Sequence, residues 1–316
     1  MSDLHKFLFE GLPVRGMLVR LTDSWKEVLE RRAASGAYAA PVQSMLGEMA
    51  AAATLMQANL KFDGALVLQV HGDGPVKLAV AESLSDLRFR VTATVQGAVD
   101  DAARFDELVN RGGHGRCAIT LDPKDRAGGQ QPYQGVVPLE TPDGAPVASV
   151  ASMLEHYMRQ SEQLETRIVL AASDDAACGL LIQRLPVEGE NNLAGTARAE
   201  IDEDAFNRIS HLASTLTSQE LLTLDAQTIL HRLFWEETVR LFEPEHPRFT
   251  CSCSVDRVRS MLRKLGREES ESILRERDDI EIGCDFCGRQ YHFDAVDVGE
   301  MFAPIGSQPG ANERRH

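Results

Sequence analysis

The chain has 316 residues, of which 43% are hydrophobic, and its formal net charge is −15. That charge argues against nucleic-acid binding, which needs a basic face, and against adhesion to anionic membranes. The N-terminus has no signal-peptide pattern and no apolar run approaches the roughly 18 residues that span a bilayer, so a cytoplasmic protein is expected. In a reducing cytoplasm, paired cysteines indicate metal-binding or redox chemistry before structural disulfides.

Residues 1–186 are predicted to form one α+β domain of mixed sheet and helix. The elements expected in chain order are a strand over Arg15–Leu21, a helix that starts with a capping box at Ser24 and Glu27, a long helix over Pro41–Leu60, three strands in residues 65–71, 76–80 and 87–91, and a helix over Ala148–Leu164. Short turns separate the three strands, which is typical of an antiparallel meander.

Residues 187–247 form an expected acidic linker. A polar, turn-rich stretch, Glu188–Asn192, begins it, and apolar residues then recur at helical spacing from about residue 199 to Phe242. Between Pro186 and Pro247 there are 12 acidic and 4 basic residues, a net charge of −8. Repulsion among these charges predicts that the compact linker is only marginally stable.

Residues 248–302 contain two cysteine pairs, Cys251-Ser-Cys253 and Cys284-Asp-Phe-Cys287, with 30 residues between them. Four thiolates in two close pairs can bind one Zn²⁺ in a tetrahedron, or the four thiols can instead form two local disulfides. A module with so few apolar residues usually needs a metal or a disulfide to stay folded. The intervening residues predict helices over Val255–Leu265 and Glu268–Arg275, and a short strand follows at Tyr291 and Phe293. The polar tail, residues 303–316, is expected to be disordered.

The same four cysteines allow three kinds of chemistry. A permanent structural zinc ribbon, a redox switch and a catalytic dithiol all fit the spacing. Peroxide or hypochlorous acid could oxidise the thiolates, with Cys284 and Cys287 closing a ring readily and Cys251 and Cys253 closing a smaller, more strained one. His246 and His292 flank the pairs and are expected to lie beside the site or on the surface instead of binding the metal.

No other constellation predicts an enzyme. The sequence has no nucleophile-elbow motif, no His-Glu-x-x-His zinc motif and no phosphate loop for ATP. Cys117 and Cys178 are isolated and are expected to be buried as small apolar groups. The prediction is therefore a protein without catalytic residues.

Taken together, these segments closely resemble the heat shock protein 33 family of redox-regulated chaperones. The two cysteine pairs carry most of the resemblance, supported by Val14-Arg-Gly16, Leu46-Gly-Glu48, Tyr133-Gln-Gly-Val-Val137 and Gln183-Arg-Leu-Pro186. One departure is Tyr38-Ala-Ala-Pro41, where the family would place the proline next to the tyrosine.

The resemblance implies an ATP-independent holdase that is largely inactive when it is reduced and zinc-bound. Oxidation of Cys251, Cys253, Cys284 and Cys287 to two disulfides would release zinc and unfold the linker, and the oxidised protein would form a homodimer and bind unfolding client proteins. Two alternatives differ in their expected behaviour. A constitutive zinc-ribbon interaction protein would resist mild oxidants, and a dithiol oxidoreductase would turn over disulfide substrates.

Overall fold

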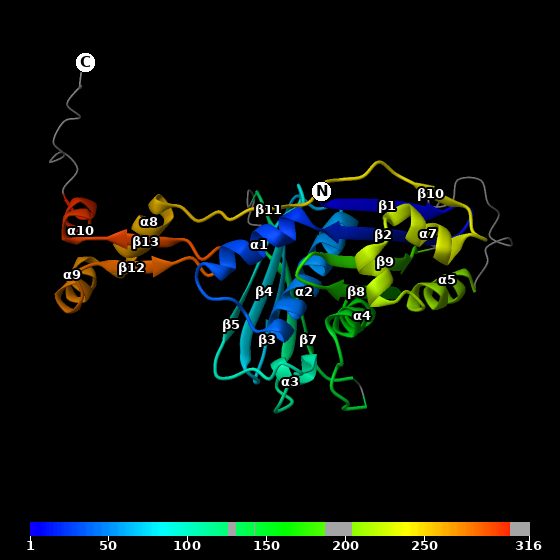
Figure 1. Ribbon diagram of the computed structural model, residues 1–316, viewed down its shortest axis with the longest axis horizontal. Helices are drawn as coiled ribbons and strands as arrows, with labels where there is room; N and C mark the ends of the chain where they lie inside the picture. Colours follow the sequence, from blue (N-terminus) through cyan, green and yellow to red (C-terminus); the bar gives the residue numbers. More distant parts are fainter. Residues whose placement is uncertain (126–130, 142, 187–203, 304–316) are drawn as a thin grey trace, which may run out of the picture. The chain divides into compact units, whose positions relative to one another are not determined.

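The structure is a computed structural model that describes residues 1–125, 131–141, 143–186 and 204–303 (Figure 1). It divides into two compact units, Met1–Thr250 and Cys251–His316. The fold is mixed α+β, which confirms the predicted class. The turn-rich stretch Glu188–Asn192, the rest of 187–203 and nearly all of the predicted tail lie outside the described residues. Within the described residues, no helix is both long and apolar enough to cross a membrane.

One sheet of the first unit is antiparallel throughout. Its order is β10 (Val239–Leu241), β1 (Asp3–Phe9), β2 (Val14–Leu21), β9 (Ala177–Arg184) and β8 (Thr166–Ala172). Strand β2 carries Gly16 opposite Phe7 of β1. A Cβ at Gly16 would lie 2.1 Å from the Phe7 ring, so only glycine lets this ring pack flat against the strand.

A second sheet of the same unit contains the predicted meander. Its order is β11 (Arg248–Phe249), β5 (Arg88–Val95), β4 (Val76–Leu84), β3 (Gly64–His71), β6 (Arg116–Pro123) and β7 (Tyr133–Pro138). Neighbouring strands are antiparallel, except that β11 runs parallel to β5. Strands β3, β4 and β5 are neighbours, so the predicted antiparallel meander is confirmed.

Helix α2 (Ala40–Asn59) contacts strands of both sheets and is buried on most sides. Its run Ala50–Ala53 is fully buried, because alanine lets a helix approach two sheets at once. The predicted helix Pro41–Leu60 is therefore confirmed, with the proline in its first turn. The other helices of this region are α1 (Asp23–Ala33), α3 (Phe105–Val109) and α4 (Val150–Gln160), which is shorter than predicted.

The capping box predicted at Ser24 is wrong. Helix α1 begins at Asp23, so Ser24 lies inside its first turn, where its hydroxyl is 2.7 Å from that of Ser2. Ser2 also donates to Asp23 through its backbone and side chain. The polar contacts at the start of α1 therefore come from Ser2, about twenty residues earlier in the chain, and not from the local capping box that we expected.

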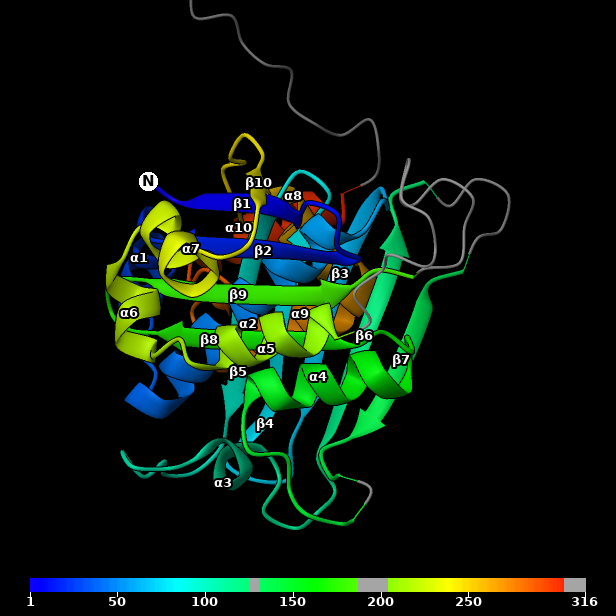
Figure 2. The ribbon, with the colours of Figure 1, turned by 90° about the vertical axis from the view of Figure 1, so that its right-hand side faces the viewer.

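The described part of the linker forms three helices, α5 (Ala205–Ser214), α6 (Ser218–Thr223) and α7 (Ala226–Phe234). They lie over one face of the five-stranded sheet (Figure 2). Their buried residues join strand residues in one cluster, in which the rings of Phe9 and Phe234 are 5.0 Å apart. The helical pattern ends earlier than predicted, because Val239–Leu241 alternates and pairs with the outer edge of β1 as β10.

The second unit is small. It contains α8 (Val255–Leu265), α9 (Arg267–Glu276), the hairpin β12 (Ile280–Gly283) and β13 (Gln290–Phe293), and α10 (Ala295–Met301). Both predicted helices and the strand at Tyr291 and Phe293 are confirmed, while β12 and α10 were not predicted. The buried core consists of Leu262, Ile280, Tyr291, Phe293, Val298 and Met301.

Candidate metal and redox centre

Two local structures position the four cysteines. Cys251 and Cys253 directly precede α8, whose first turn is capped by Ser254, because its side chain accepts from the Arg257 amide at 3.2 Å. Cys284 and Cys287 lie in the turn of the β12–β13 hairpin, which is closed by the Gly288 amide donating to the Cys284 carbonyl at 2.8 Å. Gly288 has φ of 68°, a conformation that glycine adopts without strain.

The four sulfurs converge on one point. The Sγ atoms of Cys251 and Cys284 are 3.5 Å apart, those of Cys253 and Cys287 are 3.4 Å apart, and all four lie within 4.8 Å of one another. A tetrahedron with Zn–S bonds of about 2.3 Å has sulfurs roughly 3.8 Å apart, so the arrangement fits a four-coordinate metal ion. An all-sulfur donor set selects soft or borderline metals such as zinc over calcium or magnesium.

Hydrogen bonding makes the four thiols unequal. Burial raises the pKa of Cys251 and of Cys287. Burial also opposes ionisation of Cys253, but bonds from Tyr291 and the other thiols outweigh it and lower the Cys253 pKa to about 7. The Tyr291 hydroxyl donates to Cys253 Sγ at 3.1 Å. A thiol of this kind reaches the nucleophilic thiolate form most easily.

Sequence reasoning missed this role of Tyr291. Its alternation with Phe293 predicted a strand, and the strand is present, but nothing in that pattern indicated a hydrogen bond to sulfur. The tyrosine reaches Cys253 because β13 begins just after the Cys284–Cys287 turn and its inward face looks towards the start of α8. The only available signal was a hydroxyl-bearing residue four positions after Cys287.

The two flanking histidines bond elsewhere. His246 Nδ1 lies 3.1 Å from the Ser2 carbonyl oxygen, and His292 Nδ1 lies 2.7 Å from Asp279 Oδ2. Among the described residues, the cluster of possible metal ligands at this place contains the four cysteines alone.

Comparison with known proteins decides the family. The Hsp33 protein family matches residues 2–294 of the chain. The chain belongs to the Hsp33 family. It is 45% identical over 315 residues to a 33 kDa chaperonin of Chromobacterium violaceum, covering 100% of this chain and 98% of that protein. It is 44% identical over 316 residues to a 33 kDa chaperonin of Methylobacillus flagellatus, covering 100% and 99%.

A solved structure supports the Hsp33 fold. The crystal structure of the 33 kDa chaperonin from Thermotoga maritima superposes with a TM-score of 0.75 over 95% of this chain and 98% of that one. The sequence identity is 19%, so this likeness speaks for the fold alone. The resemblance drawn from the cysteine pairs and the N-terminal segments is therefore confirmed at the level of the Hsp33 family.

Proposed function

We propose that this Hsp33 family member is an oxidation-activated, ATP-independent holdase of the cytoplasm. In the reduced form Cys251, Cys253, Cys284 and Cys287 bind one Zn²⁺, and the protein is inactive. Oxidation activates it to bind unfolding clients as a homodimer, without nucleic acid, membrane or catalysis. The observation that carries this proposal is the convergence of four sulfurs in a small unit with a minimal apolar core.

The proposal assigns a role to each part of the chain. Residues 1–186 are the chaperone core, 187–247 the metastable linker, 248–302 the zinc redox switch and 303–316 the C-terminal tail. The switch begins directly at the end of the linker. Cys251 is the second residue after β11, whose Phe249 packs edge-on against Phe89 with the rings 6.5 Å apart.

The chemistry of the switch follows from the four thiolates. A bound zinc ion would hold them together and stabilise the small unit, since metal binding in such a unit is coupled to its folding. Peroxide or hypochlorous acid takes two electrons from each pair of thiolates and leaves a disulfide. A disulfide sulfur no longer serves as a thiolate ligand, so two such reactions release the metal and remove what folds the unit.

Loss of the small unit would then act on the linker. Helices α5, α6 and α7 bury one apolar face against the five-stranded sheet, while the described acidic residues lie mostly at their ends, with Asp204 before α5, Asp225 before α7 and Glu236 and Glu237 after α7. When the helices detach, both the sheet and the helices offer apolar surface with these solubilising charges beside it. Exposed apolar surface of this size suits the capture of unfolding proteins.

Light scattering from a heat-unfolding client protein tests the proposal. The chain is added either reduced and zinc-loaded, or oxidised with its zinc removed. Suppression of aggregation by the oxidised form alone supports the switch. If both forms behave alike, the metal is structural and the alternative, a constitutive zinc-ribbon interaction protein, replaces it. Peptide mapping of the oxidised chain identifies which cysteines are joined.

Two native cysteines report whether the linker detaches. Cys178 of β9 is fully buried in the cluster that α5, α6 and α7 cover, and Cys117 of β6 is fully buried in the other sheet. After oxidation of the four switch cysteines, we expect a maleimide to label Cys178 much faster than before and Cys117 as slowly as before. Equal protection of both thiols in the oxidised chain would show that the linker stays in place.

A further inference from the structure

Strand β11 joins the six-stranded sheet through only two residues. It pairs parallel to β5, with Phe249 beside Phe89, and it lies next to α1 (Figure 1). Two amides of this segment donate to carbonyls at the β5 edge. The Arg248 amide donates to the Leu87 carbonyl at 3.2 Å, and the Thr250 amide donates to the Phe89 carbonyl at 3.0 Å. The first of the four switch cysteines follows directly in the chain.

The side chain of Phe249 fills a slot that suits an aromatic ring. Phe249 is buried, and its ring meets the ring of Phe89 edge-on with the centroids 6.5 Å apart. The Arg31 guanidinium of α1 lies over the Phe249 ring, 5.3 Å from its centroid. Aromatic pairs and a cation above a ring both add to the free energy of apolar burial. The slot therefore favours an aromatic side chain, whereas the hydrogen bonds beside it need only a backbone.

The parts of the slot are held in place without β11. Arg31 is fixed from its own helix, since its Nε and Nη2 donate to Glu27 Oε1 at 2.9 and 2.6 Å. Phe89 is paired with β4, and in the hairpin turn before it the Leu87 amide donates to the Leu84 carbonyl at 2.8 Å. Both acceptor carbonyls and the cation therefore stay in position when β11 leaves.

A side chain closes the far end of the same edge. The Tyr38 hydroxyl accepts from the Ala93 amide at 2.9 Å and donates to the Ala93 carbonyl at 3.0 Å. The Arg32 guanidinium lies 4.2 Å from the centroid of the Tyr38 ring. Once β11 leaves, the open edge thus runs from Leu87 to Val91 and admits only a short extended segment.

We propose that this edge of β5 binds a short, extended segment of an unfolding client protein, with an aromatic side chain in the slot that Phe249 fills in the reduced chain. Pairing with a sheet edge beside one side-chain pocket is a recurring mode of peptide recognition. Unfolded chains expose aromatic rings and free backbone groups, which folded proteins bury and pair. The inference rests on the proposed holdase function and names one client subsite within it.

Strand β11 is then a built-in substitute for the client. One residue separates Phe249 from Cys251, so unfolding of the switch frees the strand. The freed strand stays tethered to the chain and competes for the slot. A two-residue strand binds weakly, so a client that also contacts the apolar surface beneath the linker displaces it. Removal of the Phe249 ring should therefore strengthen client binding, which the loss of a purely structural residue would not do.

Fluorescence anisotropy of a labelled peptide with the sequence of this segment, acetyl-Pro-Arg-Phe-Thr-amide, tests the proposal on the full chain. We expect no binding to the reduced, zinc-loaded chain, in which the slot is filled, and binding to reduced Phe249→Ser. The oxidised chain should bind the peptide as well, and oxidised Phe249→Ser should bind it several times more tightly. Phe242→Ser, at an exposed phenylalanine outside β11, should behave as the unmodified chain in both forms.

Two altered peptides separate the ring from the backbone. Glycine in place of the phenylalanine removes the ring, and N-methylation of the threonine removes the N–H that would donate to the Phe89 carbonyl. Each change should raise the dissociation constant by at least about tenfold. Equal binding of the glycine peptide, or no binding of the original peptide to reduced Phe249→Ser, overturns the proposal. Cys178 labelling as slow as in the unmodified chain verifies that reduced Phe249→Ser keeps its linker in place.

A second variant tests the slot itself. Arg31→Met removes the cation above the ring and should raise the dissociation constant of the phenylalanine peptide about two- to fivefold in the oxidised chain. Lys26→Met, at an exposed position of the same helix, should leave it unchanged. The same weakening by both variants would show that the charge of α1, and not the cation over the ring, is what the peptide senses.

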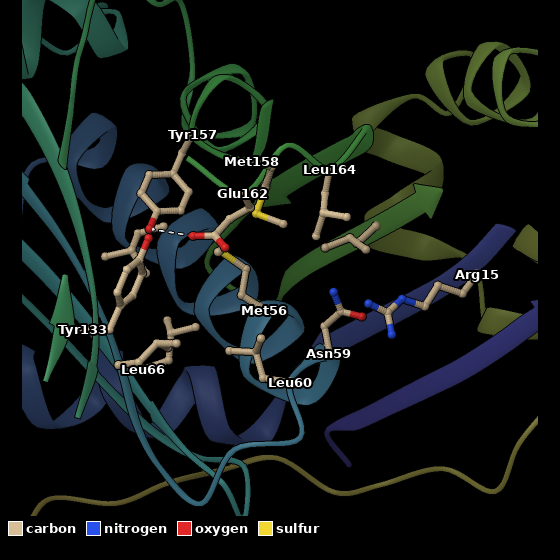
Figure 3. A pocket seen from close by; sticks show the side chains of 13 residues that line it. Arg15, Met56, Asn59, Leu60, Leu66, Tyr133, Tyr157, Met158, Glu162 and Leu164 are labelled. Atoms are coloured by element: carbon tan, nitrogen blue, oxygen red, sulfur yellow. Dashed lines mark hydrogen bonds between the residues drawn. The ribbon is translucent and has the colours of Figure 1, made fainter. Parts of the chain in front are cut away.

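A benzophenone in place of the peptide's phenylalanine ring locates the site by photocrosslinking. Crosslinks to the oxidised chain should fall in β5 and α1. The first unit also has an apolar cleft, shown in Figure 3, whose lining includes Leu60, Tyr133 and Met158. None of residues 248–250 lines this cleft, so its opening does not depend on β11. Crosslinks confined to the cleft would overturn the proposal.

The aggregation assay separates this inference from the holdase proposal. We expect oxidised Phe249→Ser to need less protein than oxidised Phe242→Ser for the same suppression. Equal or weaker suppression by Phe249→Ser overturns the client subsite and leaves the holdase in place. Peptide binding without suppression by any oxidised form overturns the holdase proposal instead. Loss of the oxidised homodimer in Phe249→Ser, without peptide binding, would assign the slot to β11 of a second copy of the chain.

Discussion

The linker region and the C-terminal unit are stabilised in different ways. The linker helices and the sheet beneath them share an apolar cluster of 20 buried residues, whereas the apolar core of the described part of the C-terminal unit has six. The linker region is stabilised by the burial of many apolar side chains. Each contributes a small part of the stability, which a mutation can reduce. The C-terminal unit instead depends on four sulfurs at one point, so a single chemical change there can remove most of its stability at once.

The largest expected effect is metal removal. Structural zinc sites contribute about 10–16 kcal/mol of apparent binding energy, against a typical domain stability of about 5–15 kcal/mol. A strong chelator should therefore unfold residues 251–303 while both sheets of the first unit persist. Hydrogen exchange of the β12–β13 amides measures this, and added zinc should restore their protection. Amides that stay protected in chelator would show that the six-residue core suffices.

A mutation that creates a cavity beneath the linker helices should have the next largest effect. Ile229 of α7 is fully buried in the shared cluster, so Ile229→Ala should cost about 2–5 kcal/mol. Maleimide labelling of Cys178 in the reduced protein should speed up, while the C-terminal unit keeps its metal. His231→Ala, at an exposed position of the same helix, is the control. Loss of zinc from the Ile229→Ala variant would contradict the prediction that the two regions are stabilised independently.

Arg20 of β2 offers a smaller, polar test of the same interface. Its guanidinium donates to the carbonyls of Leu221 at 3.2 Å, Leu222 at 3.3 Å and Leu224, at the end of α6. Arg20→Met should weaken the attachment of α6 by about 1.5–3 kcal/mol, the usual contribution of hydrogen bonds from a charged group. The oxidant concentration for half-maximal Cys178 labelling should fall. Arg116→Met, on exposed Arg116 of β6, should not change it.

The smallest expected effect concerns pH. Burial raises the pKa of Glu48 in α2 to about 7. The folded protein therefore holds this proton more tightly than the unfolded chain, so the stabilisation is present at acidic pH and is lost as pH rises from about 4.5 to 7. Between pH 5 and pH 8 we expect the first unit to lose about 1–2 kcal/mol.

Glu48→Gln should remove most of this pH dependence. Denaturant unfolding of the first unit at several pH values measures it, with Glu30→Gln at an exposed position of α1 as the control. Because Glu48 belongs to the first unit, the metal affinity of the four cysteines should be the same in both variants. A pH profile that Glu48→Gln leaves unchanged would assign the titration to another group.

The sequence predicted the elements whose signals are local. Pro41 and the apolar run behind it specified α2, helical spacing specified α8, and alternation specified the meander of β3, β4 and β5. The cysteine spacing indicated a cluster of four sulfurs, because two close pairs of cysteines in a short module can bind one metal ion together. It also carried the family resemblance that the comparisons confirm.

The tertiary structure decided what depends on distant partners. The alternation of Val239–Leu241 becomes a strand only because β1 offers an open edge, and Ser24 loses its capping role to Ser2. Tyr291 can donate a hydrogen bond to the sulfur of Cys253 only because β13 faces the start of α8 in the folded unit. The hydrogen bond from Arg15 to Gln183 joins residues that are 168 positions apart. Helix and strand periodicities report neighbours within a few positions of the chain, whereas these contacts are fixed by which faces the folded sheets bring together.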